Sequence, residues 1–265
     1  MYSDQVKERS QKLEAWLKGR SREAGVAIAA RSALRVLPVF WNWAETSPQA
    51  KEWEVSSLLP LWANLATWLV AMRRSEDNRA MAEAASQHAG ECGAVMGNKG
   101  EELEKLGALH AATAGSMAAL HAGEAYTPDP DKIPFLTVLY ASISDGMGHQ
   151  KMAVQIYDAA LRDCALIDRG KQVIYEPLWL GEKNPFESDW KALSVKLGPK
   201  KSFLGGLFGG KPTGTNLWWD WYQRALDGRG QIHLENLEAM SWKIGQSFPL
   251  MYIIPSPEER AQRKA

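Results

Sequence analysis

The tetrapeptide His-Ala-Gly-Glu occurs twice in the sequence. A His and a Glu three residues apart share one helix face, and two such pairs facing each other could hold a divalent metal ion, as carboxylate-bridged bundles do. Those bundles, however, use Glu-x-x-His and add glutamates from two further helices. Both tetrapeptides also lie near the C-terminal ends of predicted helices, which an antiparallel hairpin places over ~20 Å apart. We therefore expect the histidines to stabilise helix ends, and keep as an alternative a metal-dependent enzyme that uses His88, Glu91, His121 and Glu124.

A glycine-rich segment is the second candidate for chemistry. Residues 205–211 read Gly-Gly-Leu-Phe-Gly-Gly-Lys, which supplies the glycines and the lysine of a phosphate-binding loop. Pro212 follows where a magnesium-binding Ser or Thr is required, and no hydrophobic strand precedes the loop, so we expect neither a nucleotide nor another cofactor. The lysines of the predicted loop 198–215 indicate a solvated basic linker, with contact to phosphates or anionic lipid as the alternative: Lys200, Lys201 and Lys211.

The strongest local feature is aromatic. Residues 218–222 read Trp-Trp-Asp-Trp-Tyr, in a chain with twelve tryptophans. Helical spacing places one group on a single face, which a core-packing helix would explain: Trp218, Trp221, Tyr222 and Leu226. The remaining tryptophan is predicted to point outward. Because Trp and Arg dominate the energetics of protein interfaces, we expect a partner protein to bind the surface formed by Trp219, Arg224 and Arg229.

Composition indicates an ordinary globular protein. The chain has 265 residues, its 31 Lys and Arg balance its 31 Asp and Glu, and hydrophobic residues make up 45%. This balance gives no nucleic-acid signature. Two cysteines are too few for a disulfide framework, and no secretory signal precedes Asp4 and Lys7, so we expect a cytoplasmic protein. We expect no catalytic residue, because no nucleophile motif such as Gly-x-Ser-x-Gly is present.

The elements that position these residues are predicted to be helices, because apolar residues repeat at steps of three and four. The expected helices cover residues 4–19, 24–37, 55–72, 76–96, 101–123, 133–144, 149–168, 186–197, 216–226 and 231–245. The second is expected to end near Pro38, since proline disfavours helix in the residue before it, and residues 42–51 to form a loop. Residues 173–175 are a possible short strand.

The predicted fold is an irregular all-α array with an alanine-rich helical hairpin between residues 76 and 123. Residues 1–170 are expected to form a helical bundle and residues 171–265 a smaller Trp-rich portion, or the two to form one continuous domain. The uncharged run Val55–Met72 is predicted to be a buried core helix. It falls short of the ~20 apolar residues that span a bilayer, so a membrane-active protein remains a lesser alternative.

Four groups of residues carry a resemblance. They are Ala-Ala-Arg-Ser-Ala-Leu-Arg-Val-Leu-Pro at 29–38, Leu-Pro-Leu at 59–61, Pro-Leu-Trp at 177–179 with Trp-Lys-Ala-Leu at 190–193, and Trp-x-Asp-Trp-Tyr at 218–222 with Leu-x-Gly-Arg at 226–229. In this order they resemble a family of uncharacterised, mainly α-proteobacterial helical proteins, over residues 25–230. The resemblance implies a helical module that precedes variable C-terminal parts, although Ala225 stands where the family has Arg.

The function expected from the sequence is therefore that of a non-enzymatic protein-interaction or regulatory protein, an adaptor or a sensor. A module that recurs ahead of differing parts suits such a role by analogy. The metal-dependent enzyme and the membrane-active protein are the alternatives.

Overall fold

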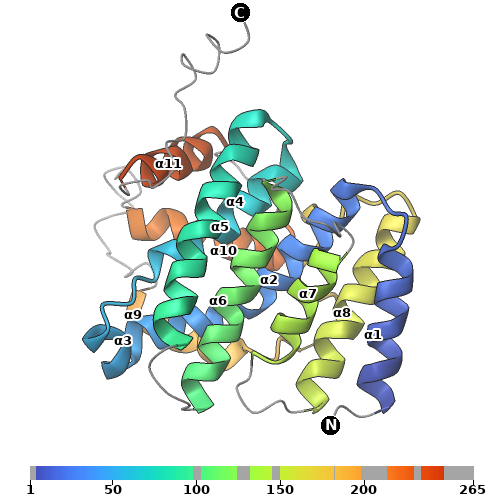
Figure 1. Ribbon diagram of the computed structural model, residues 1–265, viewed down its shortest axis with the longest axis horizontal. Helices are drawn as coiled ribbons and strands as arrows, with labels where there is room; N and C mark the ends of the chain where they lie inside the picture. The colour runs from blue at the N-terminus through green and yellow to red at the C-terminus, as the bar shows by residue number, and fades with distance from the viewer. Residues whose placement is uncertain are drawn as a thin grey trace, which may run out of the picture.

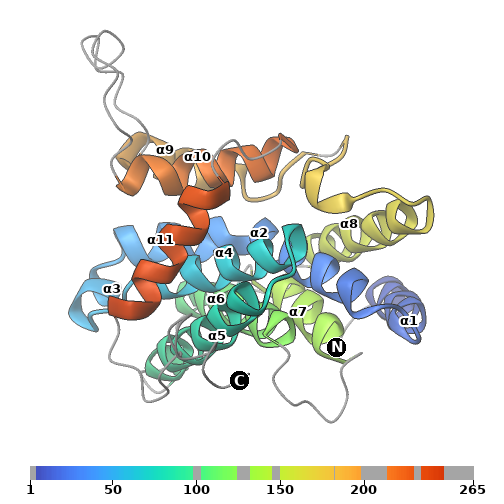
Figure 2. The ribbon, with the colours of Figure 1, turned by 90° about the horizontal axis from the view of Figure 1, so that it is seen from above.

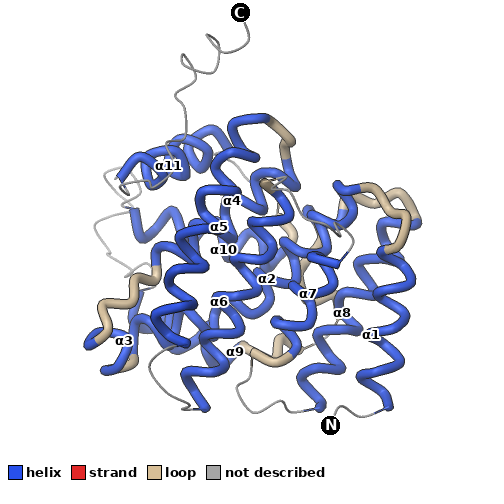
Figure 3. The backbone as a smooth tube through the Cα atoms, in the orientation of Figure 1, coloured by secondary structure: helices blue, strands red, loops and turns tan. Residues whose placement is uncertain are grey.

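The computed structural model describes residues 4–97, 103–123, 132–144, 150–181, 183–197, 214–229 and 234–247. These residues form α-helices and one 3-10 turn and contain no strand, which confirms the all-α prediction (Figure 3). The elements are α1 (Asp4–Leu17), α2 (Arg22–Thr46), α3 (Pro48–Glu52), α4 (Leu58–Met72), α5 (Glu76–Gly97), α6 (Leu103–Ala122), α7 (Lys132–Ser142), α8 (Gln150–Asp168), η1 (Val173–Tyr175), α9 (Glu187–Leu197), α10 (Gly214–Asp227) and α11 (Leu234–Ser247).

The helices form layers around α2 and α4 (Figures 1 and 2). Figure 2 shows α2 and α4 in the middle, with α5, α6 and α7 on one side and α9 and α10 on the other. Helix α11 packs against α4 and α5, and α1 pairs with α8 at one end of the molecule. One hydrophobic core runs through the layers and joins residues from Val6 to Ile244.

Small side chains bring α5 and α6 close together, as the alanine-rich sequence predicts. The hydroxyls of Ser86 and Ser116 each donate to the other residue's backbone carbonyl, at 2.9 Å in both directions. A β-carbon at Gly123 would lie 2.7 Å from the backbone nitrogen of Glu83. The two helix backbones therefore meet directly, and the hairpin is confirmed.

Helix α2 does not end near Pro38, so that prediction was wrong. The helix continues to Thr46, with Pro38 fully inside it. Proline has no N–H, which leaves the carbonyl of Leu34, four residues earlier, without its helical donor. The buried hydroxyl of Tyr222 donates to this carbonyl at 3.1 Å. Burial raises the pKa of Tyr222, which keeps its hydroxyl protonated as the donor. A hydrogen bond from α10 thus replaces the one that proline removes.

We expect Tyr222→Phe to lower the free energy of unfolding by about 1–3 kcal/mol, because it leaves a buried carbonyl unsatisfied. Pro38→Ala supplies the N–H that the Leu34 carbonyl lacks, so Tyr222→Phe should cost less in that background. Urea denaturation of the four proteins of this double-mutant cycle measures the coupling. Equal costs of Tyr222→Phe in both backgrounds would show that Tyr222 does not substitute for the missing donor.

Two further predictions of local structure were wrong. The expected loop 42–51 consists of the last turn of α2 followed by α3, because Ser47 ends one helix and its hydroxyl accepts from the Gln49 N–H to start the next. The possible strand at residues 173–175 is the 3-10 turn η1. Its backbone has no neighbouring strand in the described part of the chain, and its Val173 carbonyl instead accepts from the side chain of Arg31 on α2.

The apolar run that raised a membrane alternative forms α4, fifteen residues long and buried along most of its length. Within the described residues, α2 alone is long and apolar enough to cross a membrane by length and composition. The fold buries 83% of that apolar window. A buried core helix meets the same criterion, so this is weak evidence for a membrane span.

Candidate functional site

The predicted interaction residues on α10 make more contacts within the protein than the sequence suggests. Trp219 is half-buried and stacks on Trp190 with ring centroids 3.7 Å apart, so it does not project freely. Arg224 pairs with Asp220 at 2.8 Å. Arg229 keeps 67% of its side chain exposed and pairs with Asp227. The opposite face is buried as predicted, through Trp218, Trp221 and Tyr222.

The two candidate metal-binding histidines lie against different helices. The ring of His88 is 6.0 Å from that of Trp62 on α4. His121 packs on α2, where the missing side chain of Gly25 makes room for its Nε2. Among the described residues, no group of three or more His, Cys, Asp or Glu could hold a metal ion. The side chain of Glu91, the whole of Glu124 and the basic loop residues Lys200, Lys201 and Lys211 lie outside the described residues.

The expected separation of these histidines was wrong, and so was the expected role of His121. The contact between Ser86 and Ser116 sets the hairpin register, which separates His88 and His121 by only ~10 Å along the helix axes at ~1.5 Å per residue. They are therefore not at opposite ends of the hairpin. Burial, followed by the charge of Arg22, lowers the pKa of His121 to about 4. The neutral imidazole packs on α2 and supplies no charge to the α6 terminus.

A buried charge cluster joins α2 to α8. Arg31, Arg35 and Asp163 each have side chains that are 1% exposed. Both arginines bind the same carboxylate oxygen of Asp163, at 2.9 Å from Arg31 Nε and 2.6 Å from an Arg35 Nη. Burial lowers the pKa of Arg35 to about 10, and the Asp163 charge opposes this, so the guanidinium stays protonated at neutral pH. We call these three residues the arginine clasp.

The arginine clasp also holds η1 and the chain that follows it. Arg31 donates to the carbonyls of Val173, Glu176 and Pro177, and Arg35 donates to that of Leu178. Residues 177–178 in turn meet the end of α10, where the Leu178 N–H donates to the Leu226 carbonyl at 3.1 Å. Segments 29–38, 177–179 and 226–229, far apart in the sequence, thus meet at one place. Because the clasp is sealed from solvent, it assembles the fold and offers no surface to a ligand.

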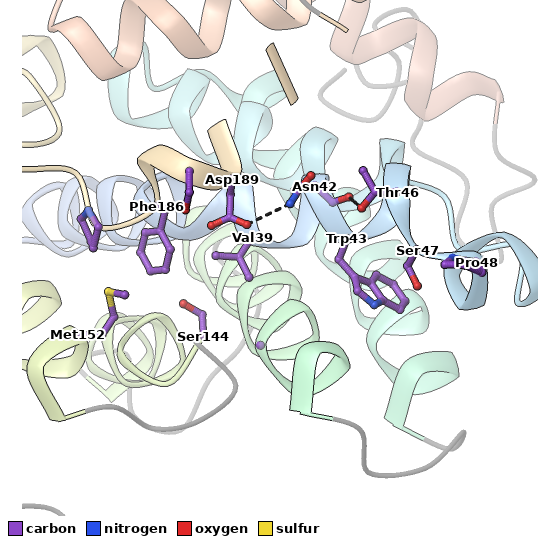
Figure 4. Close-up of a pocket in the computed structure, with 13 residues that line it drawn as sticks. Val39, Asn42, Trp43, Thr46, Ser47, Pro48, Ser144, Met152, Phe186 and Asp189 are labelled. Atoms are coloured by element: carbon purple, nitrogen blue, oxygen red, sulfur yellow. Dashed lines mark hydrogen bonds between the residues drawn. The ribbon is translucent and has the colours of Figure 1, made fainter. Parts of the chain in front are cut away.

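An open groove lies between α2, α8 and the start of α9, and we call it the α2–α9 groove (Figure 4). It consists of two adjoining cavities that share Met152, Pro185 and Ser188 in their walls. The first, which we call the aspartate half, has a volume of about 590 Å³. Its apolar walls include Val39, Trp43, Pro48 and Phe186, and its polar groups include Asn42, Thr46, Ser47, Ser144 and Asp189.

Asp189 is the acidic group of the aspartate half. Figure 4 shows its carboxylate between the side chains of Phe186 and Asn42. The amide of Asn42 donates to Asp189 Oδ1 at 3.1 Å. Burial raises the pKa of Asp189 above its ordinary value, and the hydrogen bonds from Asn42 and from the Asp189 backbone oppose this shift. No ion pair joins Asp189 to a Lys, Arg or His among the residues that the structure describes, so hydrogen bonds and no cation offset its charge there.

The second cavity, the lysine half of the groove, has the opposite charge. Its volume is about 610 Å³, and its walls include Lys151, Lys183 and Lys191 beside Gln155 and Asn184. Glu187 is its acidic group and pairs with Lys191 at 2.6 Å. The described walls therefore carry three cations and one anion, so this half is basic while the other half is acidic.

Sequence reasoning missed both the arginine clasp and the groove. The clasp had a signal, since Arg31 and Arg35 are the only charged residues between Glu23 and Glu45 in an otherwise apolar helix. A charge in such a helix is buried and needs a partner. The groove had no local signal, because Asn42 and Asp189 are 147 residues apart in sequence.

No protein family, no curated protein and no solved structure matches this chain.

Proposed function

We propose that the chain is a non-enzymatic protein-interaction module, of the adaptor or sensor type, that binds an extended segment of a partner protein in the α2–α9 groove. One observation carries the proposal. The groove combines apolar walls with charged groups of both signs, of which Asp189 has no ion-pair partner among the described residues. This proposal moves the expected interaction site from the exposed face of α10 to the other side of α9.

The size of the groove suits a segment of polypeptide. Either half alone has the volume of a small-molecule site, which is roughly 300–1,000 Å³, and the two adjoin at Met152, Pro185 and Ser188. An extended chain can fill both halves, with side chains in the pockets and its backbone polar groups near the rim hydroxyls of Thr46 and Ser188.

The helices that line the groove are fixed by packing against the rest of the protein. The floor of the aspartate half is α2, which packs against α4, α6 and α7 in the core. The start of α9 is held by Trp190, which is 7% exposed and whose indole N–H donates to Gln223 of α10. Since Val39, Met152 and Asp189 belong to packed helices, much of the site is formed before binding, which reduces the entropy cost of association.

The test is selection of binders from a random twelve-residue peptide library displayed on phage, with the full chain as target. Ser188 is exposed and borders both halves, so Ser188→Trp fills the groove without disturbing the core. Val195 lies on the same helix, is 89% exposed and borders neither half, so Val195→Trp is the matched control. We expect Ser188→Trp to weaken binding of the selected peptides at least tenfold, or about 1.4 kcal/mol, and the control less than twofold.

Two outcomes would overturn the proposal. One is a library that yields no binder. The other is a set of peptides that bind Ser188→Trp as well as the unaltered chain. If those peptides instead lose affinity with Trp219→Ala, the exposed face of α10 is the interaction surface, as the sequence predicts.

A further inference from the structure

We infer that the segment bound in the α2–α9 groove carries an arginine or lysine that pairs with Asp189, next to acidic residues that face the lysine half. This inference rests on the proposed function and names the chemistry of the partner. The two halves of one continuous groove have opposite charge, so a segment with the opposite arrangement of charges complements both.

The position of Asp189 favours a basic partner group. Its side chain is half-buried and lines a cavity whose walls include Phe186 and Val39. Placing a carboxylate among apolar side chains costs free energy unless a cation or several hydrogen bonds compensate it. The side-chain hydrogen bond that it accepts comes from the neutral amide of Asn42. A basic side chain from a partner would supply the compensating charge.

The shape of the aspartate half suits a long basic side chain. Arginine and lysine have long apolar stems that cover hydrophobic surface while the charged head reaches a polar group. Val39 and Phe186 offer such a surface beside the carboxylate, as Figure 4 shows, and Met152 of α8 also lines the cavity. A purely apolar anchor would fill the same space but would leave the carboxylate desolvated and unpaired, which disfavours it.

The lysine half favours acidic groups in the same segment. Lys151 and Lys183 are exposed and border the cavity from α8 and from the chain before α9. Lys191 already pairs with Glu187, so these two lysines carry the net positive charge of the described walls. Acidic residues of a bound segment would lie next to Lys151 and Lys183, in the half of the groove that Asp189 does not line.

The experiment uses the peptides selected against the full chain, compared by fluorescence anisotropy. We expect an Arg or Lys to recur next to Asp or Glu among the selected sequences. Asp189→Asn keeps the shape of the side chain and an oxygen for the Asn42 amide, and should weaken these peptides at least tenfold. Replacing the basic residue of the peptide by norleucine should weaken binding of the unaltered chain similarly, and should add little to Asp189→Asn. Asp220→Asn on α10 is the control and should change affinity less than twofold.

A double substitution tests the proposed role of the lysine half. Lys151→Gln combined with Lys183→Gln should weaken the same peptides about fivefold and flatten the salt dependence of binding, since screening acts on these exposed charges. Replacing the acidic residues of the peptide by Gln should give no further loss in that double variant.

The results separate this inference from the proposed function. If Ser188→Trp abolishes binding while Asp189→Asn leaves affinity unchanged, the groove binds a partner but the basic anchor is wrong. Selected peptides without any basic residue would overturn the anchor as well. If Ser188→Trp has no effect, the proposed function itself fails, whatever Asp189→Asn does.

Discussion

Asp163→Asn is expected to lower the free energy of unfolding by about 3–5 kcal/mol, because removing one partner of a buried ion pair leaves an uncompensated charge. Here one carboxylate oxygen serves both Arg31 and Arg35, so a single substitution leaves two buried guanidinium groups without an anion. Asn preserves the shape of the side chain, so the change tests the charge and not a cavity. A loss of this size is a large fraction of the ~5–15 kcal/mol by which domains are stable.

Urea denaturation followed by circular dichroism measures this loss. The matched control is Asp158→Asn on the same helix, because Asp158 pairs with Arg9 near the surface, where the two side chains are 35% and 25% exposed. Exposed pairs contribute at most ~1 kcal/mol, so the control should change little. Equal effects of the two substitutions would contradict a special role for the clasp.

The helices could be predicted from the sequence because apolar periodicity is a local property. The run Val55–Met72 and the alanine-rich hairpin show this, since each carries its burial pattern within one segment. The failures at residues 38 and 42–46 share one physical cause, whereas the start of α3 depends on the local cap of Ser47. A proline rule and a loop composition are local, whereas the donor that lets α2 continue, Tyr222, comes from a helix 184 residues beyond Pro38 in the sequence.

The candidate site depends on contacts between distant segments of the chain even more than the helices do. Trp219 was expected to face solvent from the spacing on its own helix, yet Trp190 of α9 covers one side of it. No pattern within α10 contains that information. The α2–α9 groove likewise exists only because α8 and α9 are placed on opposite sides of Val39 and Asn42 by the rest of the fold (Figure 4). Arg31 and Arg35 are the exception, since charges in an apolar helix could have indicated a buried partner.

A substitution at the end of α10 should destabilise the protein about as much as one in the arginine clasp. Gly228 is the residue at which this is expected. Its φ is +68°, a conformation that costs other residues ~1 kcal/mol or more. A β-carbon there would also lie 2.3 Å from the backbone nitrogen of Pro177 and 2.7 Å from the carbonyl carbon of Glu176. Neither backbone atom can rotate away, so Gly228→Ala must move the chain that Arg31 and Arg35 hold.

Gly170→Ala separates the free-energy cost of backbone strain from that of the steric contact. Gly170 has a similar φ of +74° and follows the end of α8 as Gly228 follows that of α10, but a β-carbon at Gly170 would meet no atom within 4 Å. We expect Gly170→Ala to cost about 1 kcal/mol from backbone strain alone, and Gly228→Ala about 3–4 kcal/mol, because overpacking adds roughly 1–3 kcal/mol. Thermal and urea unfolding of both variants measure the difference. Equal costs would mean that the contact with Pro177 yields easily, and that the arginine clasp alone fixes residues 176–178 on the bundle.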